Sequence, residues 1–476
     1  MKKRSSREGF MDRLSELPDS IIFHIFWSLP MTDVVRTTIL SKRWKNLWTT
    51  APYLNFDNGA MEFGDDRKLE NFINRALLRW KGVRVLKFKF KSGYEFDESM
   101  YVGIDFWVQF AKDKEVEELY LDIILFDDIY WLPQCLHSCS SLKVLSFKNC
   151  NFRVYGDVQW NQLKSLTIID GFGVTEHVIN QILYGSPRLE VLILSFVDRG
   201  ENLCIRSTSL KVLSIHKSLY FPGDPCWDSE LRICTPNLET LEIKGVPHKK
   251  CLLVNVSSLT HATLGFFGLH GFDEYDSDFP GMDTERGLFT LDDFLGDMFC
   301  RILSTIQHVE NVTLMFRCIK VLGAMIKRCM TSSFPNVKSL HLGFCFNDYK
   351  LLVGLLQSFP QLKKLVLEYK VGNEIHEKQQ SLNFDAKSSL KFEAYPPESF
   401  LQLRTVEVTW DEDEDDDVFP FLEFLLKYAS NLEKMVFKVK GIMPPKRPSK
   451  SLFRASQKLL RMPRSSTIAQ LIFCEY

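Results

Sequence analysis

One short apolar pattern recurs along most of the chain and constrains its fold more than any other feature of the sequence. The pattern is a hexad with apolar residues at its first, fourth and sixth positions, of the form L-x-x-L-x-L, in which Val, Phe, Met or Ala can replace Leu. The hexad opens at thirteen positions: Val83, Val116, Leu142, Leu163, Leu189, Leu210, Leu238, Leu259, Val309, Val337, Leu362, Leu403 and Leu432. The mean spacing of these openings, (432 − 83)/12, is about 29 residues.

A period of this length lies at the upper end of the roughly 20–29 residues that leucine-rich repeats span, so we predict an α/β leucine-rich-repeat solenoid, or horseshoe. The fourth and sixth hexad positions share one face of a short strand and point into the core. We expect a helix in the return segment of each repeat. Thr175 suits the N-cap of such a helix, Gly185 suits the position just past its end, and Pro187 blocks its continuation. Helices of the same plan are predicted over Leu351–Phe359 and Pro420–Tyr428.

Two gaps interrupt the repeat. The stretch from Leu259 to Val309 contains an acidic piece at 273–281, and the stretch from Leu362 to Leu403 contains a polar piece at 371–389. Each gap is either a projecting loop that carries specificity or a degenerate repeat with a disordered loop.

The residue between the fourth and sixth hexad positions points outward, so the thirteen of them form one row on the solenoid. In order they are Lys87, Tyr120, Ser146, Thr167, Ile193, Ser214, Glu242, Thr263, Thr313, His341, Val366, Glu407 and Val436. The row has no basic stripe, which argues against a nucleic-acid partner. Tyr120, Ile193 and His341 are the candidates for contact with a protein substrate.

The first 55 residues do not follow the hexad and instead predict three short helices. The first is an amphipathic pattern that begins at Pro18 and Asp19, carries Ile21, Ile22, Ile25, Phe26 and Leu29, and is stopped by Pro30. Thr32 or Asp33 caps a second helix that carries Val34, Val35, Ile39 and Leu40, and 41–48 gives a third. A unit of about 40 residues is too small to complete a core alone, so it needs a partner or the next domain.

The residues from about Met11 to Asp57 closely resemble the F-box of plant F-box/leucine-rich-repeat proteins. The resemblance rests on Leu17-Pro18, on Leu29-Pro30 and on the tail Leu40-Ser-Lys-Arg-Trp44…Leu47-Trp48. It implies docking on the SKP-type adaptor of a cullin-based SCF ubiquitin ligase. The residues that it places on or near the adaptor-facing surface are Leu17, Pro18, Ile21, Ile22 and Ile25. Those that it places inside the box are Trp44, Leu47 and Trp48.

The C-terminal region, Phe392 to Tyr476, is similar to the FBD region that ends many of these plant proteins. Its segments "YPPESFLQLRTVEV" and "SQKLLRMPRSS" carry the resemblance. A terminal repeat must hide its open core, and the residues predicted to do so are Leu459, Leu460, Ile468, Leu471 and Phe473. We therefore divide the chain into a disordered basic tail (1–9), the F-box (10–57), the solenoid (58–391) and FBD-like repeats with a cap (392–476).

Composition excludes several classes of protein. Lys plus Arg number 59 and Asp plus Glu number 60, a net charge of −1, which removes the general case for a nucleic-acid or anionic-membrane binder. Twelve cysteines without a CxxC pair indicate reduced thiols and predict neither a disulfide scaffold nor a metal site. No secretory signal precedes the box, and the uncharged stretch 251–272 is too polar and glycine-rich for a membrane span. We expect a protein of the nucleus, the cytoplasm or both.

No catalytic motif has the required spacing, so we expect no enzyme, no catalytic residue and no cofactor. The acidic run Asp411–Asp417 fails as a calcium loop because Asp416 and Leu422 stand where Gly and Glu are needed. The favoured hypothesis is a substrate-recruiting subunit of an SCF-type ligase, bound through the SKP-type adaptor to a cullin scaffold and holding an unidentified protein substrate. The alternatives are an interaction scaffold with a vestigial F-box and a small-molecule co-receptor.

Overall fold

The computed structural model describes Leu14 and residues 16–57, 66–92, 100–124, 130–154, 156–171, 174–198, 201–219, 229–246, 248–266, 291–316, 318–319, 334–344, 349–369, 399–411, 419–440 and 450–475. The chain divides into two compact units, residues 1–197 and 198–476, each considered by itself. The predicted basic tail, the polar pieces at 273–281 and 371–389, and most of the acidic run lie outside the described residues.

The N-terminal box of the first unit is built from short helices. They are α1 (Asp19–Ser28), α2 (Met31–Arg36) and α3 (Lys42–Leu47), with 3₁₀ turns η1 (Thr37–Ile39) and η2 (Trp48–Thr50). Pro18 precedes α1 with an extended backbone, and Ser41 caps α3 by accepting a hydrogen bond from the Trp44 amide at 3.3 Å. The prediction that Thr32 or Asp33 caps the second helix is wrong. The helix begins at Met31, because the extended Pro30 already ends the preceding turn.

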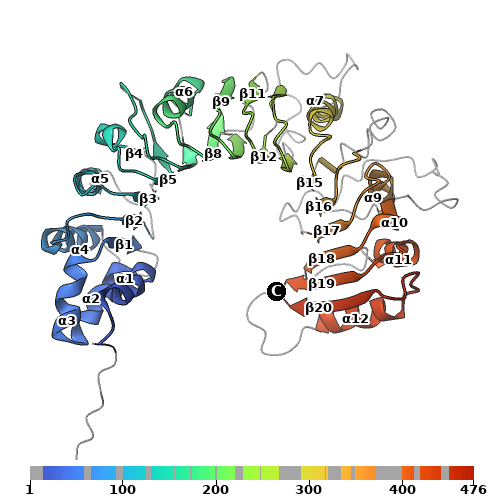
Figure 1. Cartoon of the computed structure of the whole chain (residues 1–476), viewed down its shortest axis with the longest axis horizontal. Helices are drawn as coiled ribbons and strands as arrows, with labels where there is room; N and C mark the ends of the chain where they lie inside the picture. Colours follow the sequence, from blue (N-terminus) through green and yellow to red (C-terminus); the bar gives the residue numbers. More distant parts are fainter. Residues whose placement is uncertain are drawn as a thin grey trace, which may run out of the picture. The chain divides into compact units, whose positions relative to one another are not determined.

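After the box, the first unit forms a parallel sheet with strand order β1 (Tyr53–Asp57), β2 (Lys87–Lys91), β3 (Glu118–Asp122), β5 (Val144–Lys148), β7 (Ser165–Gly171) and β8 (Val191–Asp198). A two-stranded sheet, β4 (Tyr130–Trp131) with β6 (Cys150–Asn151), lies apart from it. Helices α4 (Asp66–Arg79), α5 (Tyr101–Asp113) and α6 (Glu176–Gly185) lie on one side of the main strands (Figure 1), and η5 (Gln134–Ser138) lies between β4 and β5 in the chain.

The second unit repeats this plan with β10 (Val212–Leu219), β12 (Thr240–Gly245), β14 (His261–Phe266), β15 (Asn311–Phe316), β16 (Ser339–Phe344), β17 (Lys364–Tyr369), β18 (Thr405–Asp411), β19 (Lys434–Lys440) and β20 (Gln470–Glu475), all parallel. Its helices are α7 (Leu291–Thr305), α9 (Tyr349–Leu356), α10 (Ser399–Gln402), α11 (Phe419–Tyr428) and α12 (Lys450–Arg461).

The hexads predict the strands of both units. In the twelve hexads from Val116 onward, the first, fourth and sixth residues are all buried. The first predicted hexad is displaced by two residues. Val83 is fully exposed, whereas Val85, Phe88 and Phe90 are buried, and Lys89 is the residue in register with Tyr120. Lys89 therefore replaces Lys87 in the outward row.

Sequence reasoning missed one further hexad before that one. Ala51, Leu54 and Phe56 have the required spacing and are buried, and β1 pairs in parallel with β2. The sheet thus begins inside the range that the resemblance assigned to the F-box. This early strand places the box directly against the repeats.

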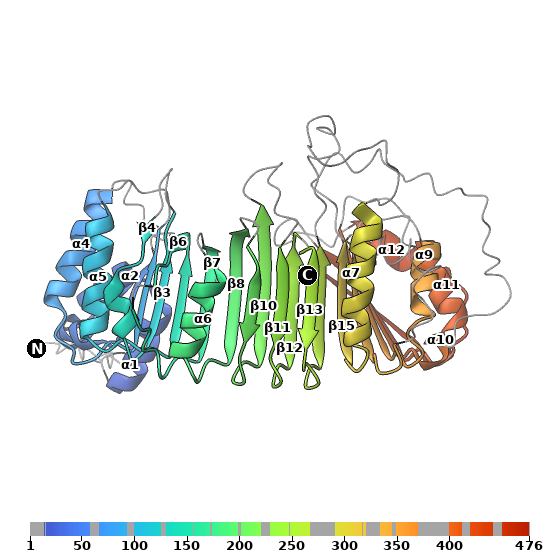
Figure 2. The same cartoon turned by 90° about the horizontal axis from the view of Figure 1, so that it is seen from above.

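The return segments between β8 and β14 are strands, so the prediction of a helix in every repeat is wrong there. β9 (Leu203–Arg206), β11 (Glu230–Cys234) and β13 (Lys250–Val254) form a separate three-stranded parallel sheet (Figure 2). Their apolar residues alternate, as in Leu203 and Ile205 or Leu231 and Ile233, which is the period of a strand with one buried face.

The predicted helices at 175–185, 351–359 and 420–428 correspond to α6, α9 and α11. The Thr175 hydroxyl accepts a hydrogen bond from the Val178 amide at 3.3 Å, as an N-cap does. Gly185 has a different role from the one predicted. It is the last helical residue, and a Cβ there would lie 2.2 Å from the carbonyl oxygen of Val158, so the position needs glycine for close packing.

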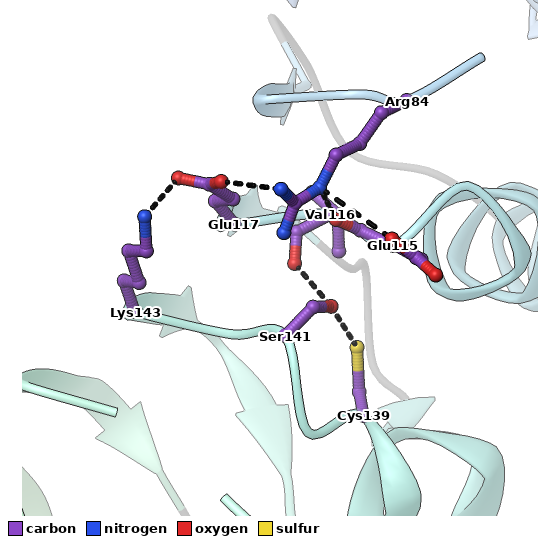
Figure 3. Close-up of polar contacts among 7 residues, drawn as sticks. All are labelled: Arg84, Glu115, Val116, Glu117, Cys139, Ser141 and Lys143. Carbon is purple, nitrogen blue, oxygen red and sulfur yellow. Dashed lines mark hydrogen bonds and ion pairs between the residues drawn. The ribbon is translucent and has the colours of Figure 1, made fainter. Parts of the chain in front are cut away.

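A ladder of backbone hydrogen bonds joins successive repeats along one rim. The carbonyl of a second-position hexad residue accepts from two amides of the next repeat. The Glu117 oxygen, for example, lies 2.7 Å from the Lys143 nitrogen and 3.0 Å from the Val144 nitrogen. Side chains reinforce this rim in Figure 3, where the Glu117 carboxylate lies between Lys143, at 2.6 Å, and Arg84, at 3.1 Å. Beneath them the Ser141 hydroxyl donates to the Val116 carbonyl at 2.8 Å.

Candidate protein-binding surfaces

The F-box has a core of its own and an apolar surface. The core residues are Ile22, Phe26, Met31, Val34, Trp44 and Trp48. Phe26 meets Trp44 edge to face, with ring centroids 5.7 Å apart. The prediction that Trp44 and Trp48 lie inside the box is confirmed, and Leu47 is half-buried.

The exposed apolar residues of the box come from the turn before α1, from α1 itself and from the end of η1. We call Leu14, Ile21, Ile39 and Leu40 the box patch. Ile21 is 47% exposed and Ile39 is 86% exposed. Sequence reasoning assigned Ile39 and Leu40 to the apolar face of a helix. The helix ends at Arg36, however, and the following 3₁₀ turn leaves both side chains in solvent.

The residues predicted to face an adaptor divide into two groups. Pro18 and Ile21 are exposed, and Leu17 and Ile25 are half-buried, so these four lie at the surface. Ile22 has no exposed area, and its placement at the surface is corrected here. On a helix, Ile22 and Phe26 are one turn apart and share the inward face, while Ile21 and Ile25 share the adjacent one.

The box is fastened to the first repeats by an aromatic cluster that sequence reasoning missed. Trp27 of α1 meets Tyr53 of β1 edge to face at 4.7 Å between ring centroids. The Lys87 ammonium lies 4.1 Å from the Trp27 ring and 5.0 Å from the Tyr120 ring, within range of cation–π attraction. Asn55 donates a hydrogen bond to the Leu29 carbonyl at 3.3 Å. The box therefore covers the outer edge of β1.

In the first unit the outward row contains Asn55, Lys89, Tyr120, Ser146, Thr167 and Ile193, all in register. Tyr120 and Ile193 are both half-buried, with two strands between them. The Tyr120 hydroxyl donates to Glu118 at 3.1 Å. Partial burial and the Glu118 charge raise the pKa of Tyr120 to about 12, so it presents a neutral hydroxyl and a ring face.

In the second unit the outward row carries titratable groups that lie beside partners on neighbouring strands. His341 Nε2 lies 3.4 Å from a Glu368 oxygen. Glu407 lies between Lys364, at 2.7 Å, and Lys438, at 3.0 Å, and hydrogen bonds from these lysines lower the pKa of its carboxyl group. Glu368 and Glu407 both remain partly exposed beside these neighbours.

Glu242 of the same row is held by Ser214, whose hydroxyl donates to it at 2.7 Å, and by Lys244. Burial by itself would raise the pKa of Glu242, but the hydrogen bonds from Lys244 and Ser214 outweigh that effect and lower it. Mixed, paired charges on a row of small residues suit recognition of a folded or extended protein.

Cys135 and Cys139, which lie four residues apart in and just after η5, are free thiols. Burial raises the pKa of both Cys135 and Cys139, so neither is activated as a nucleophile. Within the described part of the chain, no group of three or more His, Cys, Asp or Glu side chains is arranged to hold a metal ion. No helix among the described residues is long and apolar enough to cross a membrane.

Comparisons with known proteins agree with this architecture. The F-box domain model matches residues 14–55. A model described as the LRR repeats of FBD-associated F-box protein At5g56370 matches residues 104–270. F-box/LRR-repeat protein At3g03360 of Arabidopsis thaliana is 27% identical, over 96% of this chain and 90% of the relative.

Two further relatives from the same plant are similar to this chain. F-box/FBD/LRR-repeat protein At1g13780 is 27% identical over 97% of this chain and 98% of its own length. F-box/FBD/LRR-repeat protein At5g56420 is 31% identical over 54% of this chain and 60% of its own length. With an F-box followed by leucine-rich repeats in both sequence and structure, the chain is similar along almost its whole length to plant F-box/LRR-repeat proteins.

Proposed function

We propose that the chain is a substrate-recruiting adaptor subunit of an SCF-type, cullin-based ubiquitin ligase. The F-box docks on a SKP-type adaptor, which links it to the cullin, and the outward rows of the repeats hold a protein substrate. The observation that carries this proposal is the exposure of the four apolar side chains of the box patch on a domain that already buries six apolar residues of its own.

The chain contributes position and no reacting group to this function. Holding a substrate beside the charged conjugating enzyme raises the effective concentration of its lysines and turns a bimolecular encounter into a local one. The covered edge of β1 supports this role, because the cluster of Trp27, Tyr53 and Lys87 fixes the box against the first repeats. A box fixed against the first repeats would hold a bound substrate in a defined orientation relative to the adaptor.

Co-purification of the full chain with a SKP-type adaptor tests the proposal. The native chain is compared with Ile21→Asp and Ile39→Asp, which place charges in the box patch without entering the core. We expect each to weaken binding at least about ten-fold, because a carboxylate buried at an apolar interface loses its hydration. Tyr184→Asp on α6 is the matched control, since Tyr184 is 89% exposed and distant in sequence from the box.

Ile22→Ala separates docking from folding. Because Ile22 is buried, this variant should lower the stability of the box by about 2–4 kcal/mol, whereas Ile21→Asp should unfold at the same temperature as the native chain. A folded native chain that does not bind the adaptor would overturn the proposal and leave a repeat protein with a vestigial box. If adaptor binding survives both charge substitutions, the box patch is not the surface that docks on the adaptor.

A further inference from the structure

Apolar side chains are also exposed outside the box patch. In the last repeat Leu459 is buried as predicted, whereas Leu460 and Ile468 are 57% and 64% exposed, so the prediction that these two close the core is corrected. On α4, Leu78 is 80% exposed and lies among cationic side chains. The charges around Leu78 restrict the chemistry of what can bind there.

The segment that contains α4 is strongly basic. From Asp66 to Lys91 it has nine Lys or Arg residues and two Asp or Glu residues, a net charge of +7 in a chain whose total is −1. The cations of β2 have neighbours within the first unit, because Lys87 lies against the Trp27 ring and Lys89 pairs with Asp57 at 2.8 Å. Part of the positive charge of this segment is therefore balanced on the sheet.

Four cations on α4 and just after it lie in solvent instead. Lys68, Arg75, Arg79 and Lys81 are exposed, and within the described part of the chain their side chains make no hydrogen bond or ion pair. Lys68, Arg75 and Arg79 fall within about 40° of one another around the helix, and Leu78 lies about 60° from Arg75. We call these four cations and Leu78 the α4 face.

The stability of the helix does not explain where these cations lie. A cation in the last turn interacts favourably with the helix dipole, which accounts for Arg79. Lys68 lies in the first turn, however, where the same dipole disfavours a positive charge. Arg75 and Arg79 are one turn apart, so they repel each other. The α4 face therefore destabilises its own helix, and an anionic partner would offset that cost.

The neighbouring helix limits the size of such a partner. α5 lies beside α4, and Trp107 of α5 donates a hydrogen bond to Asn74 of α4 at 2.8 Å (Figure 1). α5 carries two exposed acids, Asp105 and Asp113. A flat anionic membrane in contact with α4 would also approach these acids, which would repel it. The α4 face is therefore suited to a narrow anionic partner that follows the one helix.

We propose that the α4 face binds a short acidic segment of a partner protein, extended along the helix. Arg75 and Arg79 are about 6 Å apart along the helix axis, and alternate residues of an extended segment are about 6.6 Å apart. Two carboxylates on one side of the segment can therefore meet the two guanidinium groups, as in other acidic motifs read by arginines. Lys68 lies about 10 Å further along, within the length of such a segment.

Leu78 separates this partner from a nucleic acid. An exposed leucine between cations gains from an apolar side chain of a bound peptide, whereas a phosphate backbone offers it no apolar group. The α4 face shares no residue with the box patch or the outward rows. The inference therefore goes beyond the proposed function and does not depend on it.

Binding of a labelled peptide to the full chain, followed by fluorescence anisotropy, tests the inference. The probe is an eight-residue peptide of glutamates with one central leucine. We expect saturable binding at 50 mM NaCl that weakens at least ten-fold at 500 mM, because salt screens exposed charges. Any segment of the chain that already occupied the α4 face would block the probe, so the full chain is a strict test.

Two substitutions locate the binding. Arg75→Glu reverses the central charge and should weaken the peptide at least ten-fold. Arg454→Glu, the same change at an exposed arginine of α12, should leave binding intact. Leu78→Ser should weaken binding of the leucine peptide but not of the same peptide with glycine at its centre. Because both α4 positions are exposed, these variants should unfold at the native temperature.

Three results would overturn the inference. The first is the absence of saturable peptide binding, and the second is peptide binding that Arg75→Glu leaves unchanged. The third is tighter binding of an eight-nucleotide single strand or of phosphatidylserine vesicles, lost in Arg75→Glu, which would assign the α4 face to that other partner. Ile21→Asp in the box patch should not alter peptide binding, so a failure here is distinguishable from a failure of adaptor docking.

Discussion

A single buried cluster shows how much one residue determines in this chain. Lys217, Ser229 and His248 are all buried in the second unit. The Lys217 ammonium donates to the Ser229 hydroxyl at 2.8 Å, and that hydroxyl lies 3.0 Å from Nδ1 of His248. The Ser229 hydroxyl can accept from the ammonium and donate to Nδ1 of a neutral His248. Burial first, and then the charge of Lys217, lower the pKa of His248 to about 3.

This shift predicts a loss of stability in mild acid. Between the ordinary histidine pKa of about 6.5 and the folded value of about 3, the unfolded state holds a proton that the folded state lacks. The free energy of unfolding therefore falls as the pH falls through that range, by at most about 1.4 kcal/mol per pH unit. His248→Asn keeps a polar partner for Ser229 and does not titrate. Urea unfolding at pH 7.5 and 5.5 should show a smaller pH effect in the variant than in the native chain; equal pH effects would refute the assignment.

Two glycines with positive φ provide a second test at this scale. Gly245 (φ +93°) and Gly156 (φ +88°) both adopt a backbone that costs an alanine about 1–2 kcal/mol. A Cβ at Gly245 would also lie 2.0 Å from the Lys217 carbonyl oxygen, whereas nothing lies within 4 Å of one at Gly156. Thermal unfolding should show Gly245→Ala less stable than Gly156→Ala by about 1–3 kcal/mol, the usual cost of overpacking. Equal losses would mean that the contact at Gly245 relaxes freely.

At the level of elements, the sequence predicted the strands of the repeats better than the segments between them. The hexad states which residues of a strand are buried, because the period of two leaves no choice of face. The return segments carry no such fixed pattern. From Leu189 to Leu210, and again from Leu238 to Leu259, the repeats span only 21 residues, too few for a strand, two turns and a helix like α6. The short length of these repeats and the alternation of apolar with other residues in their return segments are the sequence features that indicate β9 and β13.

The candidate sites were harder to predict for a related reason. Ile21, Ile22, Ile25 and Phe26 are equally apolar, and which pair turns inward depends on where Trp44 of α3 packs. That contact is made between residues about 20 positions apart, so the local pattern does not contain it. The clustering of Trp27, Tyr53 and Lys87 depends in the same way on β1, a strand that lies before the first predicted hexad.

Charge pairing between neighbouring strands gives a prediction at the element scale. Glu407 of β18 joins Lys364 of β17 and Lys438 of β19. Because the two lysines are substantially exposed, we expect Glu407→Gln to lower the free energy of unfolding by only about 0.2–1 kcal/mol, as exposed ion pairs do. The loss should shrink when urea unfolding is repeated in 1 M NaCl, where exposed charges are screened. A loss unaffected by salt would assign Glu407 a packing role.

For the whole molecule, the decisive property is that each repeat contacts its neighbours in the array. In such an array, stability is approximately a sum over repeats and the interfaces between them, so damage stays local. Leu119 of β3 and Leu340 of β16 are both fully buried fourth-position residues, one in each unit. Truncation of a buried leucine to alanine typically costs about 2–5 kcal/mol.

Hydrogen exchange followed by mass spectrometry can therefore map how far such a loss spreads. Leu119→Ala should speed amide exchange at least ten-fold in β2, β3 and β5 and leave β15 to β17 at native rates, because local opening draws only on nearby interfaces. Leu340→Ala should give the reverse pattern, and each variant thus controls for the other. If either substitution speeds exchange equally in both units, the chain unfolds as one cooperative body, and a substrate bound to one row would then stabilise every repeat.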